Sequence, residues 1–187
     1  MVSLSTLNFL LPGDHVGSQG AYEPGLVILS VAIAIFSAYM AFLMAQFAES
    51  VKTQRLRRIL LTLSGTAMGV GIWAMHFIGM LGFTVPCHSH YNPWITAFSI
   101  LPAVGASIFA LFLLHHQRPT LKELAKGGII FGAGIGTMHY TGMAAIRLHG
   151  EIYYQVVLFF LSILVAIALA TLALWFRFYS ERLLPRI

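Results

Sequence analysis

Two copies of one short pattern of methionine and histidine are the residues best suited to chemistry in this chain. The pattern occurs twice, 63 residues apart, as Met75-His76-Phe77-Ile78-Gly79-Met80 and Met138-His139-Tyr140-Thr141-Gly142-Met143. Because residues i and i+4 share a helix face, His76 lies beside Met80 and His139 beside Met143. Thioether sulfur and imidazole nitrogen suit a soft or borderline metal, above all copper, whereas magnesium and calcium prefer oxygen ligands. We therefore expect these four residues to bind copper, as one shared site or as two.

Met75 and Met138 precede the two histidines and would flank the site, offset by about 100° around the helix. A packing role is the alternative for the motif, because a membrane histidine often donates a hydrogen bond between helices and methionine often fills gaps. A second histidine group, Cys87-His88-Ser89-His90, could bind a metal or pass one inward. Two copies of the whole pattern favour the metal site at the motif.

The composition indicates that membrane-spanning helices carry these residues. Hydrophobic residues make up 58% of the chain and charged residues 9%, against roughly a quarter charged in a soluble domain. Apolar runs of about 20 residues cross a bilayer as helices, and these runs are too long and uniform for barrel strands. We predict an all-α, multi-pass bundle in one domain, residues 1–187, with residues 1–21 on the outer face. The five predicted spans are Gly25–Phe47, Ile59–Phe83, Trp94–Leu114, Leu124–Ile146 and Val156–Phe176.

Basic residues indicate how the bundle is oriented. All lysines and arginines except Arg147 follow the first, third or fifth span. By the positive-inside rule these connections are cytoplasmic, which places the N-terminus outside and the C-terminus in the cytoplasm. Both motifs then lie within the membrane near its outer surface. Because the basic residues are split among short loops, they do not form a surface for nucleic acid.

The chain consists of repeated helix pairs. Each pair begins with a helix in which a serine follows a tyrosine by eight residues, and it ends with a glycine-rich helix that carries the Met-His motif. Two pairs are complete, and a third has only its first helix. The tyrosine and serine positions are Tyr22 and Ser30, Tyr91 and Ser99, and Tyr154 and Ser162. Because small residues four apart allow close approach in membranes, we predict that the two Met-His helices pack together along their glycines, with both histidines facing protein.

The residues needed for catalysis by side chains are absent from the sequence. The six acidic residues lie in loops and at helix ends, so neither a paired-carboxylate mechanism nor a proton relay of acids is available. The sequence also lacks a phosphate-binding loop with a lysine and a nucleophile elbow. We therefore expect that the chain itself is not an enzyme.

The motifs resemble those of one known family. Met138-His139-Tyr140-Thr141 spells the name of the MHYT domain, and Trp73-Ala74-Met75-His76-Phe77-Ile78-Gly79-Met80 is similar to that family's companion motif. The tyrosine-led helices are similar to its repeats, so the resemblance extends from about Tyr22 to Phe176. It implies a sensory domain of the bacterial inner membrane that binds copper through Met and His near the outer face. The implied signal is oxygen, carbon monoxide, nitric oxide or a redox change, and the implied output is cytoplasmic, such as cyclic di-GMP turnover.

Several alternatives remain open at this point. A third Met-His helix and an output domain do not appear in the sequence, which suggests a chain cut after the fifth span or a short stand-alone member. Tyr140 is expected to hydrogen-bond a diatomic ligand on the metal, or else to be an aromatic at the membrane interface. Haem held by His76 and His139 is the main alternative to copper. A metal transporter is less favoured, because glycine and aliphatic residues rather than polar ones lie below the motifs. The sequence leaves homo-oligomer formation open.

Overall fold

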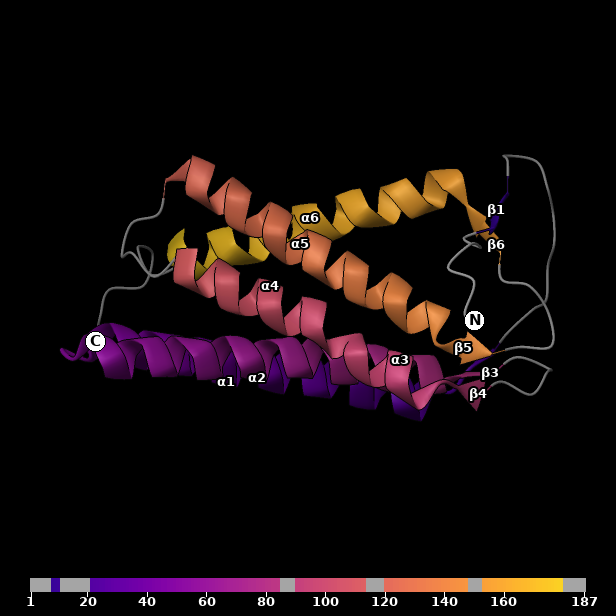
Figure 1. The fold of residues 1–187 in the computed structure, drawn as a ribbon, viewed down its shortest axis with the longest axis horizontal. Coiled ribbons are helices and arrows are strands. Elements are labelled where there is room, and N and C mark those ends of the chain that lie inside the picture. Colours follow the sequence, from indigo (N-terminus) through magenta and orange to yellow (C-terminus); the bar gives the residue numbers. More distant parts are fainter. Residues whose placement is uncertain (1–7, 11–20, 85–89, 114–119, 148–152, 180–187) are drawn as a thin grey trace.

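The fold is an all-helical bundle with short strands at one end (Figure 1). It is described from a computed structural model that covers residues 8–10, 21–84, 90–113, 120–147 and 153–179. The helices are α1 (Pro24–Ser50), α2 (Gln54–Leu81), α3 (Pro93–Phe98), α4 (Ile100–Leu113), α5 (Leu121–Ala144) and α6 (Val156–Tyr179). The strands are β1 (Asn8–Leu10), β2 (Ala21–Tyr22), β3 (Phe83–Thr84), β4 (His90–Tyr91), β5 (Ile146–Arg147) and β6 (Tyr153–Gln155). The predicted all-α, membrane-spanning class is confirmed.

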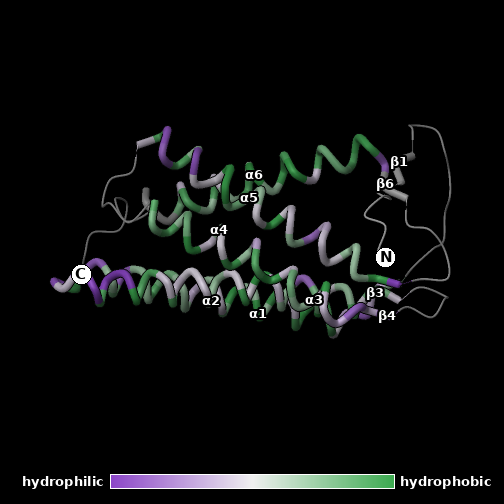
Figure 2. Tube along the Cα trace, viewed as in Figure 1, coloured by the Kyte–Doolittle hydropathy of each residue, from purple (hydrophilic) through white to green (hydrophobic). Residues whose placement is uncertain are grey.

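Within the described residues, four helical segments are long and apolar enough to cross a membrane, namely α1, α2, α6 and the combined run α3–α4. Helix α5 has 24 residues, so its length of about 36 Å also exceeds a hydrocarbon core of about 30 Å. Its glycines and polar motif residues make it less apolar, and it packs between α4 and α6. Figure 2 shows green, hydrophobic colour along the helix bodies and purple, hydrophilic colour mainly towards the two ends.

Consecutive long helices are neighbours, in the order α1, α2, α4, α5 and α6. The connection between α1 and α2, the start of α5 and the end of α6 lie at the end opposite to the strands (Figure 1). Lys52 and Arg55 lie in or beside the first of these connections, and Lys122 and Lys126 lie in the first turns of α5. Because the described lysines and most arginines gather at this end, the positive-inside rule makes it the cytoplasmic end.

Glycines set the spacing between neighbouring helices. A Cβ atom added to Gly132 of α5 would lie 2.6 Å from the Cα atom of Ile167 in α6. The glycine that corresponds to it in α2, Gly69, approaches the backbone of Val104 in α4 in the same way. Gly132 follows Gly69 by 63 residues, and Ile167 follows Val104 by the same 63 residues. The sequence repeat is therefore a repeat of helix packing.

The prediction that these glycines pack the two Met-His helices against each other was wrong. Gly69 and Gly132 face α4 and α6, the tyrosine-led helices, rather than each other. Gly134 also approaches a tyrosine-led helix, since a Cβ atom there would lie 2.9 Å from the carbonyl oxygen of Pro102 in α4. Glycine marks a close approach in a membrane but does not specify the partner helix.

The predicted third span is divided at Ser99 into α3 and α4. Pro102 has no backbone N–H to donate to the carbonyl of Phe98, so the helical ladder is interrupted there. The indole Nε1 of Trp73 in α2 donates to the carbonyl oxygen of Thr96 and to Oγ of Ser99, both at 3.1 Å. The interruption is thereby fastened to the Met-His helix α2.

Short strand pairs join the outer ends of the helices. Tyr22 of β2 pairs with Phe83 of β3, and Tyr91 of β4 pairs with Ile146 of β5, both antiparallel. Strand β1 pairs in parallel with β6. The predicted second and fourth spans included Phe83 and Ile146, but α2 and α5 end two residues earlier because the chain enters these strands. The predicted outer-face segment, residues 1–21, lies mostly outside the described residues.

Candidate metal centre

The two motif histidines occupy matching places on α2 and α5. Each lies five residues before the last residue of its helix, Leu81 in α2 and Ala144 in α5. At about 1.5 Å per residue they lie about 8 Å below the outer helix ends. Two backbone hydrogen bonds of 2.8 Å fix these ends to the starts of α1 and α3. Glu23 N donates to the Gly82 carbonyl, and Asn92 N donates to the Ala145 carbonyl.

The histidines meet in the interior of the bundle. Nδ1 of His76 and Nδ1 of His139 are 3.5 Å apart, and the ring centroids are 4.8 Å apart with an interplanar angle of 68°. Both side chains are partly buried. One ring can donate a hydrogen bond to the other only if one Nδ1 carries a proton and the other does not, and at this distance such a bond is weak. The prediction that both histidines face protein is confirmed.

One side of the His76 ring is closed by α5. Nε2 of His76 is buried and has no hydrogen-bond partner among the described residues. A Cβ atom on Gly142 would lie 3.0 Å from this Nε2 and 3.0 Å from Cζ of Phe77. Gly142 therefore permits the close contact between α2 and α5 at the histidine pair. Gly142 belongs to the motif predicted from the sequence, but its position in the motif did not indicate this role.

The four motif methionines lie on the same two helices as the histidines. Met80 and Met143 are one turn further towards the outer end, in the same i and i+4 relation to their histidines. Met138 is 1% exposed and therefore points into the core, and Met75 is partly buried. These placements are compatible with the predicted ligand set, and the ligation of a metal by the methionines stays a prediction.

Tyr140 links the motif to α6. Its hydroxyl group is 2.7 Å from Oγ of Ser162, and its ring lies against Phe159 with centroids 4.4 Å apart. The repeated tyrosine and serine spacing singled out Ser162 in the sequence but could not show which residue it contacts. The predicted hydrogen bond from Tyr140 to a bound diatomic ligand stays a prediction.

Other candidate ligands do not add to this centre. Within the part of the chain that the structure describes, no three His, Cys, Asp or Glu side chains form a metal-binding group. His90 lies in β4 and is exposed. Cys87, His88 and Ser89 lie outside the described residues. Among the described His, Cys, Asp and Glu side chains, the ligands of an ion at this pair would therefore be the two imidazoles of His76 and His139.

Comparison with known proteins identifies the family. The MHYT model, described as a bacterial signalling protein N-terminal repeat, matches residues 69–127 and 132–187. The chain belongs to the MHYT family. Each match begins at Gly69 or Gly132, inside a Met-His helix, so the family repeat has the same 63-residue shift as the glycine packing. The chain is thus a multi-pass membrane protein of a bacterial signalling family.

Curated relatives are longer signalling proteins. The chain is 41% identical over 160 residues to the bifunctional diguanylate cyclase/cyclic di-GMP phosphodiesterase MucR of Pseudomonas aeruginosa, covering 84% of this chain and 23% of that protein. It is 38% identical over 161 residues to the cyclic di-GMP phosphodiesterase NbdA of the same organism, covering 86% and 20%. It is 32% identical over 155 residues to the signaling protein YkoW of Bacillus subtilis, covering 82% and 19%. The chain therefore spans about a fifth to a quarter of their length. No solved structure matches the chain.

Proposed function

We propose that this chain is a membrane sensor that holds one copper ion between His76 and His139 and reports a diatomic gas or a redox change. The contact between the two imidazoles carries the proposal. Two nitrogens 3.5 Å apart can both reach one ion at the ~2.0 Å of a metal–imidazole bond, because their separation is less than twice that length. One shared site is therefore favoured over two separate ones.

The surroundings of the pair fit a soft, low-charge ion. Phe77 and Met138 are buried beside the histidines, with exposed fractions of 8% and 1%. Acidic residues do not occur in the outer halves of α2 and α5, so the site offers imidazole and thioether groups instead of carboxylates. This ligand set favours Cu(I), with Met80 and Met143, which share a helix face with the two histidines, as the thioether candidates. Copper there would supply an electron-rich centre for a diatomic ligand or for a change of oxidation state.

Haem fits this arrangement less well. Two axial histidines must lie on opposite faces of a planar macrocycle. Here the two rings contact each other directly, and Gly142 and Phe77 close the side at Nε2 of His76. A helix displacement would be needed to insert the macrocycle, whereas an ion needs only the space between two nitrogens.

The output that we propose is control of cyclic di-GMP turnover in the cytoplasm. Two of the relatives are named as enzymes of cyclic di-GMP metabolism, and the matched region is a small part of each. The sensor would act through a shift between two helix packings, to the extent that the signal favours one of them. Cellular cyclic di-GMP, measured with and without the gene at high and low copper, tests this output.

Elemental analysis of purified protein tests the metal site. We expect about one copper ion per wild-type chain, and little copper in His76→Ala and in His139→Ala, because each histidine would supply half of a shared imidazole pair. His90→Ala is the matched control, because it removes an exposed histidine at the same end of the bundle. A Soret band in the wild-type protein would instead identify haem.

Equal copper content in the wild type and all three variants would overturn the proposal and leave the motif histidines a packing role. If each motif variant keeps half of the copper, the sites are separate. Circular dichroism of each variant verifies that the loss of metal is not a loss of fold.

A further inference from the structure

The connection between α1 and α2 concentrates positive charge at the cytoplasmic end. We define the basic turn as Lys52, Arg55, Arg57 and Arg58, which lie within seven consecutive residues. Helix α1 ends at Ser50 and α2 begins at Gln54. The positive-inside rule explains why basic residues occur here, but it does not explain why one of them is turned inward.

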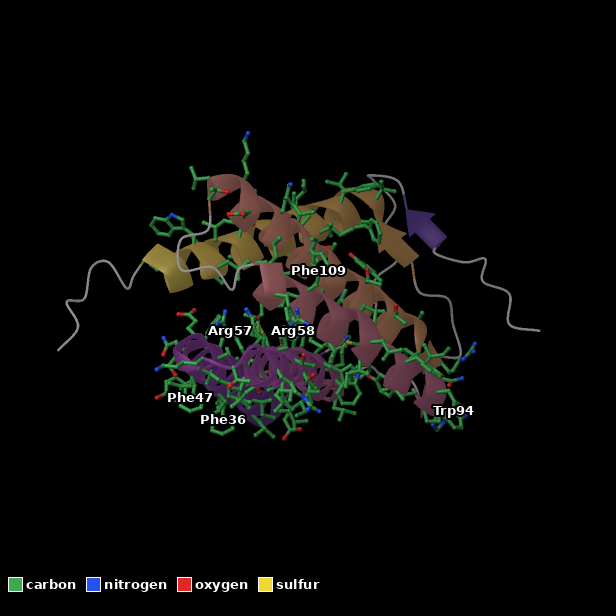
Figure 3. All side chains as sticks on the ribbon, turned by 60° about the vertical axis from the view of Figure 1, so that its left-hand side comes forward. Phe36, Phe47, Arg57, Arg58, Trp94 and Phe109 are labelled. Atoms are coloured by element: carbon green, nitrogen blue, oxygen red, sulfur yellow. The ribbon has the colours of Figure 1, made fainter. Side chains whose placement is uncertain are left out.

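Arg57 is the inward residue of the basic turn. It precedes Leu61 by one helical turn, and Leu61 packs in a cluster with Ala48 of α1 and Leu111 of α4. Arg57 is partly buried, and its Nε atom is buried without a hydrogen-bond partner among the described residues. Figure 3 shows Arg57 and Arg58 on the side of the α1–α2 pair that faces the other helices, whereas Phe36 and Phe47 point away from them. Leaving this N–H enclosed without an acceptor is costly, so the Arg57 side chain gains stability when its guanidinium group reaches an anion or another acceptor.

The local helix end adds to this preference. The side chain of Thr53, the residue before α2, accepts no capping hydrogen bond, and the first turn of α2 contains no acidic residue. Positive side chains near the positive end of a helix dipole are unfavourable. Helix α5 differs, because Thr120 and Glu123 form a capping box at its start. The first turn of α5 thus contains an acidic side chain and the first turn of α2 contains none, whereas the nearest acid to the basic turn along the chain is Glu49 at the end of α1.

The basic turn also lies at the depth of lipid phosphates. Helix α2 has 28 residues, so it is about 42 Å long and extends beyond a hydrocarbon core of about 30 Å. Its other end carries the strands of the outer face, and Arg57 is only three residues from its start. This places Arg57 at the level of the headgroup layer of the cytoplasmic leaflet.

We propose that the basic turn binds the phosphate group of an anionic phospholipid, with Arg57 as its central ligand. The guanidinium group of Arg57 donates from its two terminal nitrogens to two phosphate oxygens, a bidentate contact that lysine cannot make. Lys52, Arg55 and Arg58 supply the surrounding positive charge. Clusters of this size immediately cytoplasmic to a transmembrane helix are typical of anionic lipid recognition. The site is independent of the histidine pair, which lies near the other end of α2.

Native mass spectrometry of the purified protein, titrated with phosphatidylglycerol or phosphatidylcholine, tests the proposal. We expect phosphatidylglycerol to bind preferentially, and Arg57→Gln to weaken its binding by about tenfold, because a charge-assisted bidentate contact is lost. Arg57→Lys keeps the charge but not the bidentate geometry and should give an intermediate loss. The matched control is Lys126→Gln, which removes one positive charge from an exposed position on α5 at the same end, and we expect it to change binding less than about twofold.

Two outcomes would overturn the proposal. Equal weakening by Arg57→Gln and Lys126→Gln would show that only overall charge matters. Displacement of phosphatidylglycerol by inorganic phosphate at equal concentration would identify a soluble anion as the ligand. Melting curves of the variants in phosphatidylcholine alone verify that Arg57→Gln still folds, so that weaker binding can be assigned to the missing contact.

Discussion

Adding one methyl group at Gly132 should separate α5 from α6. In Gly132→Ala the new Cβ atom would lie 2.6 Å from Cα and 2.7 Å from N of Ile167. Carbon atoms in contact are ordinarily about 3.5–4.0 Å apart, so α6 must move outward by about 1 Å. The opposing atoms belong to the backbone, and a side-chain rotation cannot relieve the overlap.

The expected loss of stability follows from two opposing terms. Overpacking of this kind costs about 1–3 kcal/mol, and a separation of about 1 Å also forfeits up to half of the dispersion energy of the affected contacts. Alanine returns up to about 1 kcal/mol through its higher helix propensity. We therefore expect Gly132→Ala to lower the free energy of unfolding by about 1–2 kcal/mol. In Gly136→Ala, one turn further along α5, the new Cβ atom would lie 3.8 Å from Ile163 Cγ1, an ordinary contact, so this variant should be neutral or slightly more stable.

Unfolding in mixed micelles, titrated with a denaturing detergent and followed by circular dichroism, measures the difference between these two variants. We expect the midpoint for Gly132→Ala to lie below that of the wild type and the midpoint for Gly136→Ala to lie at or above it. If Gly132→Ala is as stable as Gly136→Ala, then α5 and α6 do not approach each other as closely as described. The assignment of the glycines to the tyrosine-led helices would then be refuted.

Two further variants examine the histidine centre and its link to α6. Gly142→Ala should lower the copper content in elemental analysis, because its Cβ atom would lie 3.0 Å from His76 Nε2. Gly79→Ala at the matching position of α2 should leave it unchanged, because the nearest described atom to its Cβ would be Oγ of Ser30 at 3.8 Å. Equal copper in both variants would contradict the described contact. Tyr140→Phe removes the 2.7 Å hydrogen bond to Ser162 and should lower the free energy of unfolding by about 0.5–1 kcal/mol, with copper content retained. Loss of copper in Tyr140→Phe would instead place its hydroxyl group at the metal.

The helices themselves were largely predictable from the sequence. The predicted span Val156–Phe176 begins at the same residue as α6, and Gly25–Phe47 lies within α1, because uninterrupted apolar runs of this length have no other stable form in a membrane. The inward direction of His76 and His139 also followed from the sequence, since each shares a stripe with glycines of its own helix. Periodicity thus specified which face of each helix is buried.

The partners of those faces were not predictable in the same way. A glycine in a membrane helix permits close approach by any neighbour, and only the structure shows that Gly69 meets Val104 and Gly132 meets Ile167. The break at Ser99 depends on Pro102 together with a donor from Trp73 on another helix. Pairs of two-residue strands at the outer end have no periodic signal at all, and they result from the helices having brought their ends together.

Helix α4 explains why the two histidines meet. It follows α2 in the repeat and precedes α5, and it packs against both. The backbone of Val104 in α4 lies close to Gly69 of α2, and the carbonyl of Pro102 in α4 lies close to Gly134 of α5. Because α4 packs closely against glycines of both neighbours, α2 and α5 lie near enough for their outer ends to contact each other at His76 and His139. A single repeat has one Met-His helix and cannot form this pair, so the centre is a product of the tandem arrangement and not of either motif alone.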